Sequence, residues 1–233
     1  MIIEAVLFDK DGTLIDFDAT FEPATALVLE DLASSGVSLT DLAASVGFDL
    51  ESQRILSGSV LVAGSLYDIV DHVSDVMDVE EREAMFERID GLYRQASLAT
   101  LTPFVQTEAV LRVLSARGNQ LGVATNDTYA GAKSHLDALN WSDKFQFIAG
   151  CDSGFGAKPG PGMVKAFCET VGVDAARTVM VGDSAHDCSA GHAAGAKTVA
   201  IANPENVTEW PVRPDVIISG IEELPAAVAA LGS

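Results

Sequence analysis

Short apolar runs rich in β-branched residues recur along the chain, and segments with helical apolar spacing separate them. The runs predicted to be strands are residues 2–8, 120–125, 145–149, 178–181, 197–202 and 215–218. The segments predicted to be helices are residues 107–117, 128–139, 162–171, 185–194 and 222–231. Alternation of strands with helices is typical of a mostly parallel sheet covered by helices. We therefore predict an α/β fold with a Rossmann-like, doubly wound parallel sheet.

The stretch from residue 16 to residue 101 interrupts this alternation. It contains no convincing buried strand, and residues 24–33, 66–77 and 80–96 show helical apolar spacing. We interpret it as an α-helical cap domain inserted after the first strand, with a core formed by residues 1–15 and 102–233. The pair Thr102-Pro103 indicates a break in regular structure and marks the return to the core.

Acidic residues dominate the charge of the chain, above all in the predicted cap. The 233 residues include 14 Lys and Arg against 34 Asp and Glu, which gives a net charge of −20. Residues 16–101 hold 17 of the acidic residues with four Arg and no Lys, a net charge of −13. Such a charge repels nucleic acid and anionic lipid, and the sequence has no cluster of basic residues to offset it. We expect neither a nucleic-acid partner nor a membrane partner.

Cysteine usage and the N-terminal residues indicate the compartment. The three cysteines lack a C-x-x-C spacing, which disfavours a disulfide framework or a zinc site. The first residues, MIIEAVLF, lack a basic start, and no stretch approaches the ~20 apolar residues of a membrane span. We expect a soluble cytoplasmic protein, and the sequence does not indicate its oligomeric state.

Polar residues follow the predicted strands at the ends where an open parallel sheet binds its ligands. They are Asp9, Asp11, Thr125, Asn126, Lys158, Asp183 and Asp187. On an extended chain Asp9 and Asp11 project to one side and Lys10 to the other. A helix-loop-helix calcium loop that began at Asp9 would need Gly and Glu where Leu14 and Thr20 stand, so it is disfavoured. A simple acidic turn stays open as an alternative for this pair taken alone.

Four short motifs occur in order at these strand ends: DKDGT at 9–13, ATN at 124–126, AKPGP at 157–161 and GDSAHD at 182–187. With them the chain resembles the haloacid dehalogenase superfamily of phosphohydrolases over its whole length, since the helical insert is similar to that family's small α-helical cap. The order of the four motifs and their placement at consecutive strand ends together indicate this family. Lys10 departs from the family pattern, which usually has an apolar or aromatic residue there. A lysine behind that strand end must extend to solvent or find a partner.

The resemblance implies hydrolysis through a covalent intermediate. Asp9 would be the nucleophile that forms an aspartyl-phosphate, and Asp11 would act as general acid and then as general base. The resemblance assigns Mg²⁺ to the side chains of Asp9 and Asp183 and the main-chain carbonyl of Asp11. A cation is needed because unit charges of like sign ~4 Å apart repel by about 4 kcal/mol at an effective dielectric of ~20. Asp187 would lie behind the ligands and orient Lys158 or a metal-bound water, or else be an acidic residue of a helix first turn.

Neutral and positive groups at the same strand ends are the candidates for substrate binding. Lys158 is expected to hold the phosphoryl group by its charge. The Thr125 hydroxyl and the main-chain amides near Asn126 and Gly12 are expected to donate to phosphoryl oxygens. Asn126 alternatively caps the next helix.

Features of the motifs and of the predicted cap favour one activity within the family. The resemblance implies that dehalogenases lack the second aspartate, so Asp11 favours phosphoryl chemistry. Phosphonoacetaldehyde hydrolases need a cap lysine, and residues 16–101 contain none. We predict a phosphatase of a small phosphorylated metabolite, similar to phosphoglycolate phosphatases, with residues 51–65 and Arg54 setting specificity. A sugar phosphomutase of the same superfamily is the alternative, and a phospho-receiver without turnover or a catalytically silent binding protein is less favoured.

Overall fold

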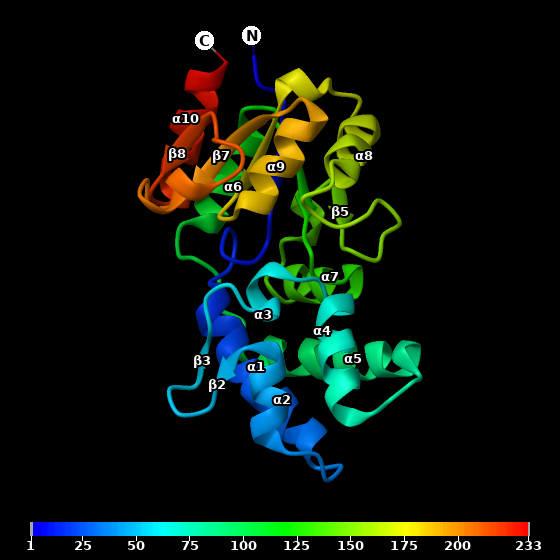
Figure 1. Cartoon of the computed structure of the whole chain (residues 1–233). Helices are drawn as coiled ribbons and strands as arrows, with labels where there is room; N and C mark the ends of the chain where they lie inside the picture. The colour runs from blue at the N-terminus through cyan, green and yellow to red at the C-terminus, as the bar shows by residue number, and fades with distance from the viewer. Residues whose placement is uncertain (1, 233) are drawn as a thin grey trace.

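A six-stranded parallel sheet forms the centre of the upper part of the protein in Figure 1. The computed structural model describes residues 2–232. The strands are β1 (Ala5–Phe8), β4 (Gln120–Ala124), β5 (Phe147–Ala149), β6 (Thr178–Gly182), β7 (Lys197–Ile201) and β8 (Val216–Ile218). Their spatial order is β5-β4-β1-β6-β7-β8, and each neighbouring pair runs parallel. The carboxyl ends of β4, β1 and β6 therefore lie side by side, at the edge where open α/β sheets bind ligands.

Helices cover both faces of this sheet, as the alternation of side chains along β1 shows. The helices are α6 (Thr107–Ala116), α7 (Tyr129–Ala138), α8 (Gly162–Val171), α9 (Ala185–Ala194) and α10 (Leu224–Leu231). Val6 and Phe8 belong to an apolar cluster with residues of α6 and α10, whereas Ala5 and Leu7 belong to a cluster with residues of α8 and α9. Successive side chains of a strand point to opposite faces, so these two helix pairs lie on opposite sides of the sheet. The predicted doubly wound α/β fold is confirmed.

The other helices gather at the end of the molecule away from both termini (Figure 1). They are α1 (Phe17–Ala33), α2 (Leu39–Val46), α3 (Val60–Ala63), α4 (Leu66–Met77) and α5 (Arg82–Thr100), with an antiparallel pair of β2 (Phe48–Asp49) and β3 (Arg54–Ile55). These elements have an apolar cluster of their own, in which Leu32, Leu42 and Ile89 are fully buried. Each such side chain contributes about 1.5–3 kcal/mol by its burial. The separate cap over residues 16–101 stays a prediction, and this third apolar cluster supports it.

The elements α1–α5, β2 and β3 are called the helical part below. Two chain segments connect it with the sheet, and they run beside each other. The amide of Asp16 donates to the carbonyl of Thr102 at 2.8 Å, and the amide of Phe104 donates to the carbonyl of Leu14 at 3.2 Å. The Thr102 amide also donates to the hydroxyl of Thr20 at 3.1 Å. These hydrogen bonds hold the chain that leaves the sheet after β1 against the chain that returns to it after α5.

Short elements account for the differences from the sequence prediction. All six predicted strands and all five predicted core helices are present, with ends that shift by up to three residues. Within residues 16–101 the sequence predicts no buried strand, and the structure adds a small, partly exposed hairpin of β2 and β3 and the unpredicted helices α2 and α3. These four elements are each between two and eight residues long, too short for a hydrophobic period to be recognised. Across residues 2–232, the structure contains no helix with the length and apolar character needed to cross a membrane.

Candidate active site

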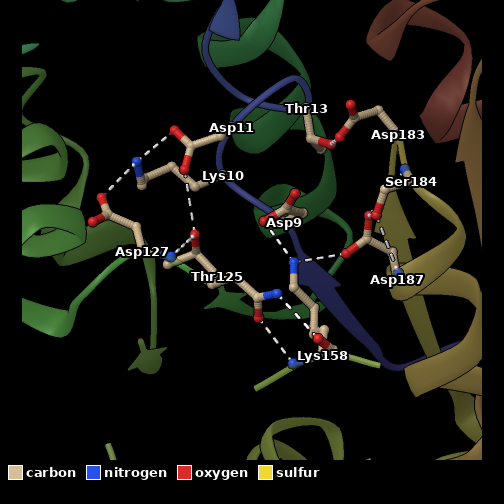
Figure 2. Close-up of polar contacts among 11 residues, drawn as sticks. Asp9, Lys10, Asp11, Thr13, Thr125, Asp127, Lys158, Asp183, Ser184 and Asp187 are labelled. Atoms are coloured by element: carbon tan, nitrogen blue, oxygen red, sulfur yellow. Dashed lines mark hydrogen bonds and ion pairs between the residues drawn. The ribbon is translucent and has the colours of Figure 1, made fainter. Parts of the chain in front are cut away.

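The end of β1 places Asp9 in a buried position against Lys158 (Figure 2). The Asp9 amide donates to the carbonyl of Val181 at 2.8 Å, which fixes the main chain beside β6. The Lys158 ammonium lies 2.7 Å from Asp9 Oδ1 and 2.6 Å from Asp187 Oδ1. Asp9 is 8% exposed and Lys158 is 5% exposed. The structure thus brings together the residues predicted as nucleophile and as phosphoryl-binding lysine.

Three carboxylates gather at this point. Asp9, Asp183 and Asp187 each offer one oxygen, and these oxygens lie within 4.8 Å of one another. Asp183 also accepts a hydrogen bond from the Thr13 hydroxyl at 3.2 Å. Three carboxylates around the single ammonium of Lys158 leave an excess of negative charge, and hard oxygen donors of this kind suit Mg²⁺. The donor set therefore fits a divalent cation.

Burial changes the titration of these groups. Burial raises the pKa of Asp9 well above its usual value, and Asp187 and Asp183 add to this rise while Lys158 opposes it. Burial, with a further contribution from Asp187, raises the pKa of Asp183 to about 7. Burial disfavours the ammonium of Lys158, but Asp187 and Asp9 outweigh this effect, and the pKa of Lys158 is raised. The cluster favours the uptake of positive charge, either as protons or as a cation.

Asp11 lies in a closed ring of polar contacts with Lys10, Thr125 and Asp127 (Figure 2). Asp11 Oδ1 is 2.5 Å from Lys10 Nζ, and Asp11 Oδ2 accepts from the Thr125 hydroxyl at 3.3 Å. Thr125 Oγ1 in turn accepts from the amide of Asp127 at 3.1 Å, and Asp127 Oδ2 lies 3.1 Å from Lys10 Nζ. Burial raises the pKa of Asp11, and the charge of Lys10 opposes that rise. The hydrogen of the Thr125 hydroxyl, expected on a phosphoryl oxygen, is directed to Asp11 in this structure.

Lys10 differs from its predicted position. The chain bends at Lys10, so the extended geometry of β1 does not continue and the Lys10 ammonium turns toward Asp11. The side chain does not reach solvent, since its exposed fraction is 0%. Of the two possibilities for a lysine at this place, the structure shows the one in which it finds partners.

Gly12 allows the chain to turn close to Asp183. Its φ is +78°, a conformation that residues with a Cβ rarely adopt, and an added Cβ would lie 2.3 Å from Asp183 Oδ2. The Gly12 amide donates to the carbonyl of Ile15 at 2.9 Å, so the turn itself uses the donor that was expected to bind phosphate. Gly12 thus shapes the site through its lack of a side chain.

Asn126 and Asp187 fix the loop that carries Lys158. Asn126 Oδ1 accepts from the Lys158 amide at 2.8 Å, and Asn126 Nδ2 donates to the Lys158 carbonyl at 3.0 Å. The residue that caps α7 is Thr128, so the alternative role of Asn126 as a helix cap is wrong. Asp187 has both of the roles that were expected as alternatives. It is an acidic residue in the first turn of α9, where it forms a capping box with Ser184, and it also accepts a hydrogen bond from Lys158.

A cavity of about 560 Å³ opens over these residues, between the sheet and the helical part. Its wall includes every predicted site residue of the sheet end except Asp187, namely Asp9, Asp11, Gly12, Thr125, Asn126, Lys158 and Asp183. His186 also lines it, as do six residues of the predicted specificity loop: Ile55, Ser57, Leu61, Val62, Gly64 and Ser65. The structure therefore brings the motif residues and part of residues 51–65 to one cavity.

Arg54 is placed apart from this wall. Its side chain is 62% exposed and its Nε lies 3.2 Å from Glu22 Oε1. Within the described part of the chain, Arg94 is the one residue of α1–α5 with a cationic side chain on the cavity wall. Arg94 lies on α5 with three other lining residues, Asp90, Tyr93 and Ser97. Sequence reasoning missed this polar stripe, although the spacing of 90, 93, 94 and 97 places all four on one helix face.

Comparisons with known proteins agree with the fold and the motifs. The family model for haloacid dehalogenase-like hydrolases matches residues 3–195. The chain is 31% identical to a phosphoglycolate phosphatase of Neisseria meningitidis, over 95% of this chain and 92% of that protein. It is 26% identical to an N-acetylmuramic acid 6-phosphate phosphatase of Pseudomonas aeruginosa, over 96% and 94% of the two chains.

A solved structure shows the same fold. The crystal structure of CbbY from Rhodobacter sphaeroides in complex with phosphate superposes with a TM-score of 0.74 at 20% identity, covering 96% of each chain. The predicted resemblance is therefore confirmed over nearly the whole chain, and so is the prediction of an enzyme that catalyses hydrolysis. The protein belongs to the haloacid dehalogenase-like hydrolase family.

Proposed function

We propose that the protein is a Mg²⁺-dependent phosphatase of a small phosphorylated metabolite, with Asp9 as nucleophile and Asp11 as general acid and base. The observation that carries this proposal is the buried Asp9 carboxylate at the end of β1, 2.7 Å from the Lys158 ammonium and open to the cavity. A carboxylate held against a cation beside a cluster of oxygen ligands suits attack on a phosphorus atom.

The proposed reaction gives each of these side chains one task. Asp9 attacks phosphorus, the ester bond to the leaving oxygen breaks, and Asp11 supplies the proton that this oxygen takes up. Asp11 then accepts a proton from the water that attacks the aspartyl-phosphate, and inorganic phosphate leaves. Lys158 balances charge on the phosphoryl oxygens throughout, while Asn126 and Asp187 keep Lys158 in place.

The acidic cluster is proposed to hold Mg²⁺ through the side chains of Asp9 and Asp183 and the carbonyl of Asp11. Asp187 is proposed to lie behind them, since Lys158 and Ser184 already occupy its two oxygens. A bound Mg²⁺ supplies charge neutralisation for the phosphoryl group and its nucleophile.

The substrate is proposed to resemble phosphoglycolate, a small phosphomonoester with a carboxylate. The named relatives include several phosphoglycolate phosphatases at about 30% identity. Arg94 on the cavity wall offers a charge for a substrate carboxylate, and Asp90 lies 3.6 Å from it. A phosphomutase would need the helical part to bind a second phosphate. Among the described residues that line the cavity, α1–α5 contribute one cationic side chain, Arg94, which suits a carboxylate with a single charge better than a second phosphate dianion, so we place phosphatase activity first.

The test is steady-state turnover of a panel of phosphorylated metabolites, including 2-phosphoglycolate and hexose phosphates, with Mg²⁺ and after chelation. We expect multiple turnovers with release of inorganic phosphate, which chelation stops. Asp9→Asn should lower kcat by more than about 10³-fold without loss of fold, whereas Asp143→Asn, at an exposed position, should leave it unchanged. Activity of Asp9→Asn within a few fold of the parent would overturn covalent catalysis, and isomerised sugar phosphate in place of free phosphate would favour the mutase.

A further inference from the structure

We propose that Lys10 is a positioning residue that holds the Asp11 carboxylate in the orientation it needs for proton transfer, an inference that rests on the proposed function. Lys10 lies in the middle of the DKDGT motif, at a place where its role is not implied by the family pattern. Its side chain is fully buried, and it is not among the described residues that line the cavity. Lys10 therefore acts on the reaction through a neighbour and not by touching substrate.

The ammonium of Lys10 has three hydrogens, and the structure gives each of them a partner. The three acceptors are Asp11 Oδ1 at 2.5 Å, Asp127 Oδ2 at 3.1 Å and His135 Nδ1 at 3.1 Å. The same ammonium lies 5.3 Å from the centre of the Phe21 ring. A lysine with every donor used and no access to water has one orientation, so it can act as a rigid support.

The support extends from the sheet to the helical part. Because Lys10 can only donate, His135 Nδ1 must accept, and the hydrogen of the neutral ring is then on Nε2. His135 Nε2 lies 2.7 Å from the hydroxyl of Ser97 on α5, so it donates there. The chain of contacts Ser97–His135–Lys10–Asp11 therefore links the helix that lines the cavity to the proposed acid and base.

The two oxygens of Asp11 are held unequally, which is the geometric basis of the role. Lys10 contacts Oδ1 at 2.5 Å, while Oδ2 has the longer contact of 3.3 Å with the Thr125 hydroxyl. A strong charge-assisted contact on one oxygen fixes the carboxylate, and the weaker contact of the other oxygen with Thr125 lets it exchange a proton. In the first step the bond from Asp9 to phosphorus forms, the ester bond breaks, and the proton moves from Asp11 Oδ2 to the leaving oxygen. Without Lys10 the carboxylate would rotate away from this arrangement.

Two esters that differ in their leaving group test this role directly. Phenyl phosphate needs a proton on its leaving oxygen, whereas 4-nitrophenolate leaves as a stable anion. The ratio kcat/KM reports steps up to the first irreversible one, the departure of the phenol, so it isolates the step in which Asp11 acts as an acid. For Lys10→Met we expect kcat/KM to fall about 10²-fold with phenyl phosphate and by less than about threefold with 4-nitrophenyl phosphate.

A matched control and a double variant complete the experiment. Lys133→Met removes a half-exposed lysine that pairs with Asp137, and it should change neither value. Adding Lys10→Met to Asp11→Asn should lower kcat/KM for phenyl phosphate by less than about threefold further, because a positioning residue has no effect once its target is gone. Equal losses with both esters, no loss with either, or a full further loss in the double variant would overturn the inference.

A charge-balanced pair keeps the test decisive if Lys10→Met does not fold. Lys10→Met together with Asp127→Asn leaves unchanged the net charge of the ring formed by Lys10, Asp11, Thr125 and Asp127, and Asp127→Asn alone is its reference. The double change should again lower the phenyl phosphate value selectively, and equal effects on both esters would contradict the proposal. A parent protein that turns over neither ester would overturn the proposed phosphatase itself, an outcome distinct from unselective losses in an active parent.

Discussion

At the scale of single residues, the site depends on close contacts between groups that repel or crowd one another. Asp9, Asp183 and Asp187 bring their oxygens within 4.8 Å, with one ammonium among them. Gly12 lets the turn after Asp11 approach Asp183 closely enough for this arrangement. Adding one atom at such a point should displace a carboxylate far enough to lower the rate of the reaction.

Gly12→Ala tests this close approach. The new Cβ would lie 2.3 Å from Asp183 Oδ2, so we expect kcat/KM to fall by about 10²-fold or more. The control is Gly36→Ala, because Gly36 also has a positive φ, +99°, but an open surrounding. It should lose about 1 kcal/mol of stability and keep its activity. Equal activity losses in the two variants would show that strain and not the contact with Asp183 is responsible.

Buried His135 should make stability depend on pH. Burial, with Lys10 beside the ring, lowers the pKa of His135 to about 3, so in acid the unfolded chain binds a proton that the folded protein does not. The folded state is therefore favoured fully above the usual pKa of about 6.5 and loses this advantage as the pH falls toward 3.

The measurement is the free energy of unfolding by denaturant at pH 7 and pH 5 for the parent and for His135→Asn. The parent should lose about 2 kcal/mol more than the variant between these two values. His72→Asn, at an exposed position of α4, should follow the parent. Parallel curves for the parent and His135→Asn would show that the pKa of His135 is not lowered in the folded protein.

Motif residues could be predicted from the sequence because chain spacing fixes their place at the ends of strands. Asp9, Lys158 and Asp183 lie within the predicted motifs, and the parallel sheet brings them to one cavity. The contact of Lys10 with His135 could not be predicted, since His135 is 125 positions away and lies in no motif. Contacts of that kind depend on how α7 packs, which hydrophobic periodicity does not specify.

At the scale of elements, α5 is the helix that joins the helical part to the site. Its residues Asp90 and Ser97 bond to Thr128 and His135 across the junction, at 2.6 and 2.7 Å. The sequence predicts a helix at residues 80–96, and the structure has it at Arg82–Thr100. The pattern predicts the helix from its apolar face, but the polar face that lines the cavity carries no recognisable motif.

Arg94→Met tests whether α5 contributes to substrate specificity. If Arg94 binds the carboxylate of 2-phosphoglycolate, its loss should raise KM for this substrate about 10- to 100-fold. Turnover of 4-nitrophenyl phosphate, which has no carboxylate, should change by less than about threefold. Arg88→Met is the matched control, since Arg88 is on the same helix and pairs with Asp31. A uniform loss with both substrates would place the carboxylate elsewhere.

At the scale of the whole molecule, three apolar clusters stabilise the fold, and the chain carries a net charge of −20. The cavity lies where the sheet and the helical part meet, so its shape depends on both. Negative charge concentrated at one end of the sheet opposes folding and favours binding of a cation. Binding of Mg²⁺ to the folded state alone should therefore stabilise the entire chain.

Thermal unfolding with and without Mg²⁺ measures this linkage. At a free concentration of about 100 Kd, a single site adds about 2.7 kcal/mol, which for a chain of this size raises Tm by about 5–10 °C. Asp183→Ala should shift the Mg²⁺ titration of both Tm and activity to higher concentrations, and Asp143→Asn should not. An unchanged titration in Asp183→Ala would move the cation to other ligands.

Trapping the covalent intermediate tests the central claim most directly. Protein quenched during turnover and treated with borohydride should contain homoserine in place of Asp9, because an acyl phosphate is reduced to an alcohol and a free carboxylate is not. Peptide mass spectrometry locates the change, and Asp9→Asn protein provides the blank. The account predicts homoserine at position 9, in an amount that falls when substrate is exhausted. Homoserine at another carboxylate, or unmodified peptides from protein caught in rapid turnover, would contradict it.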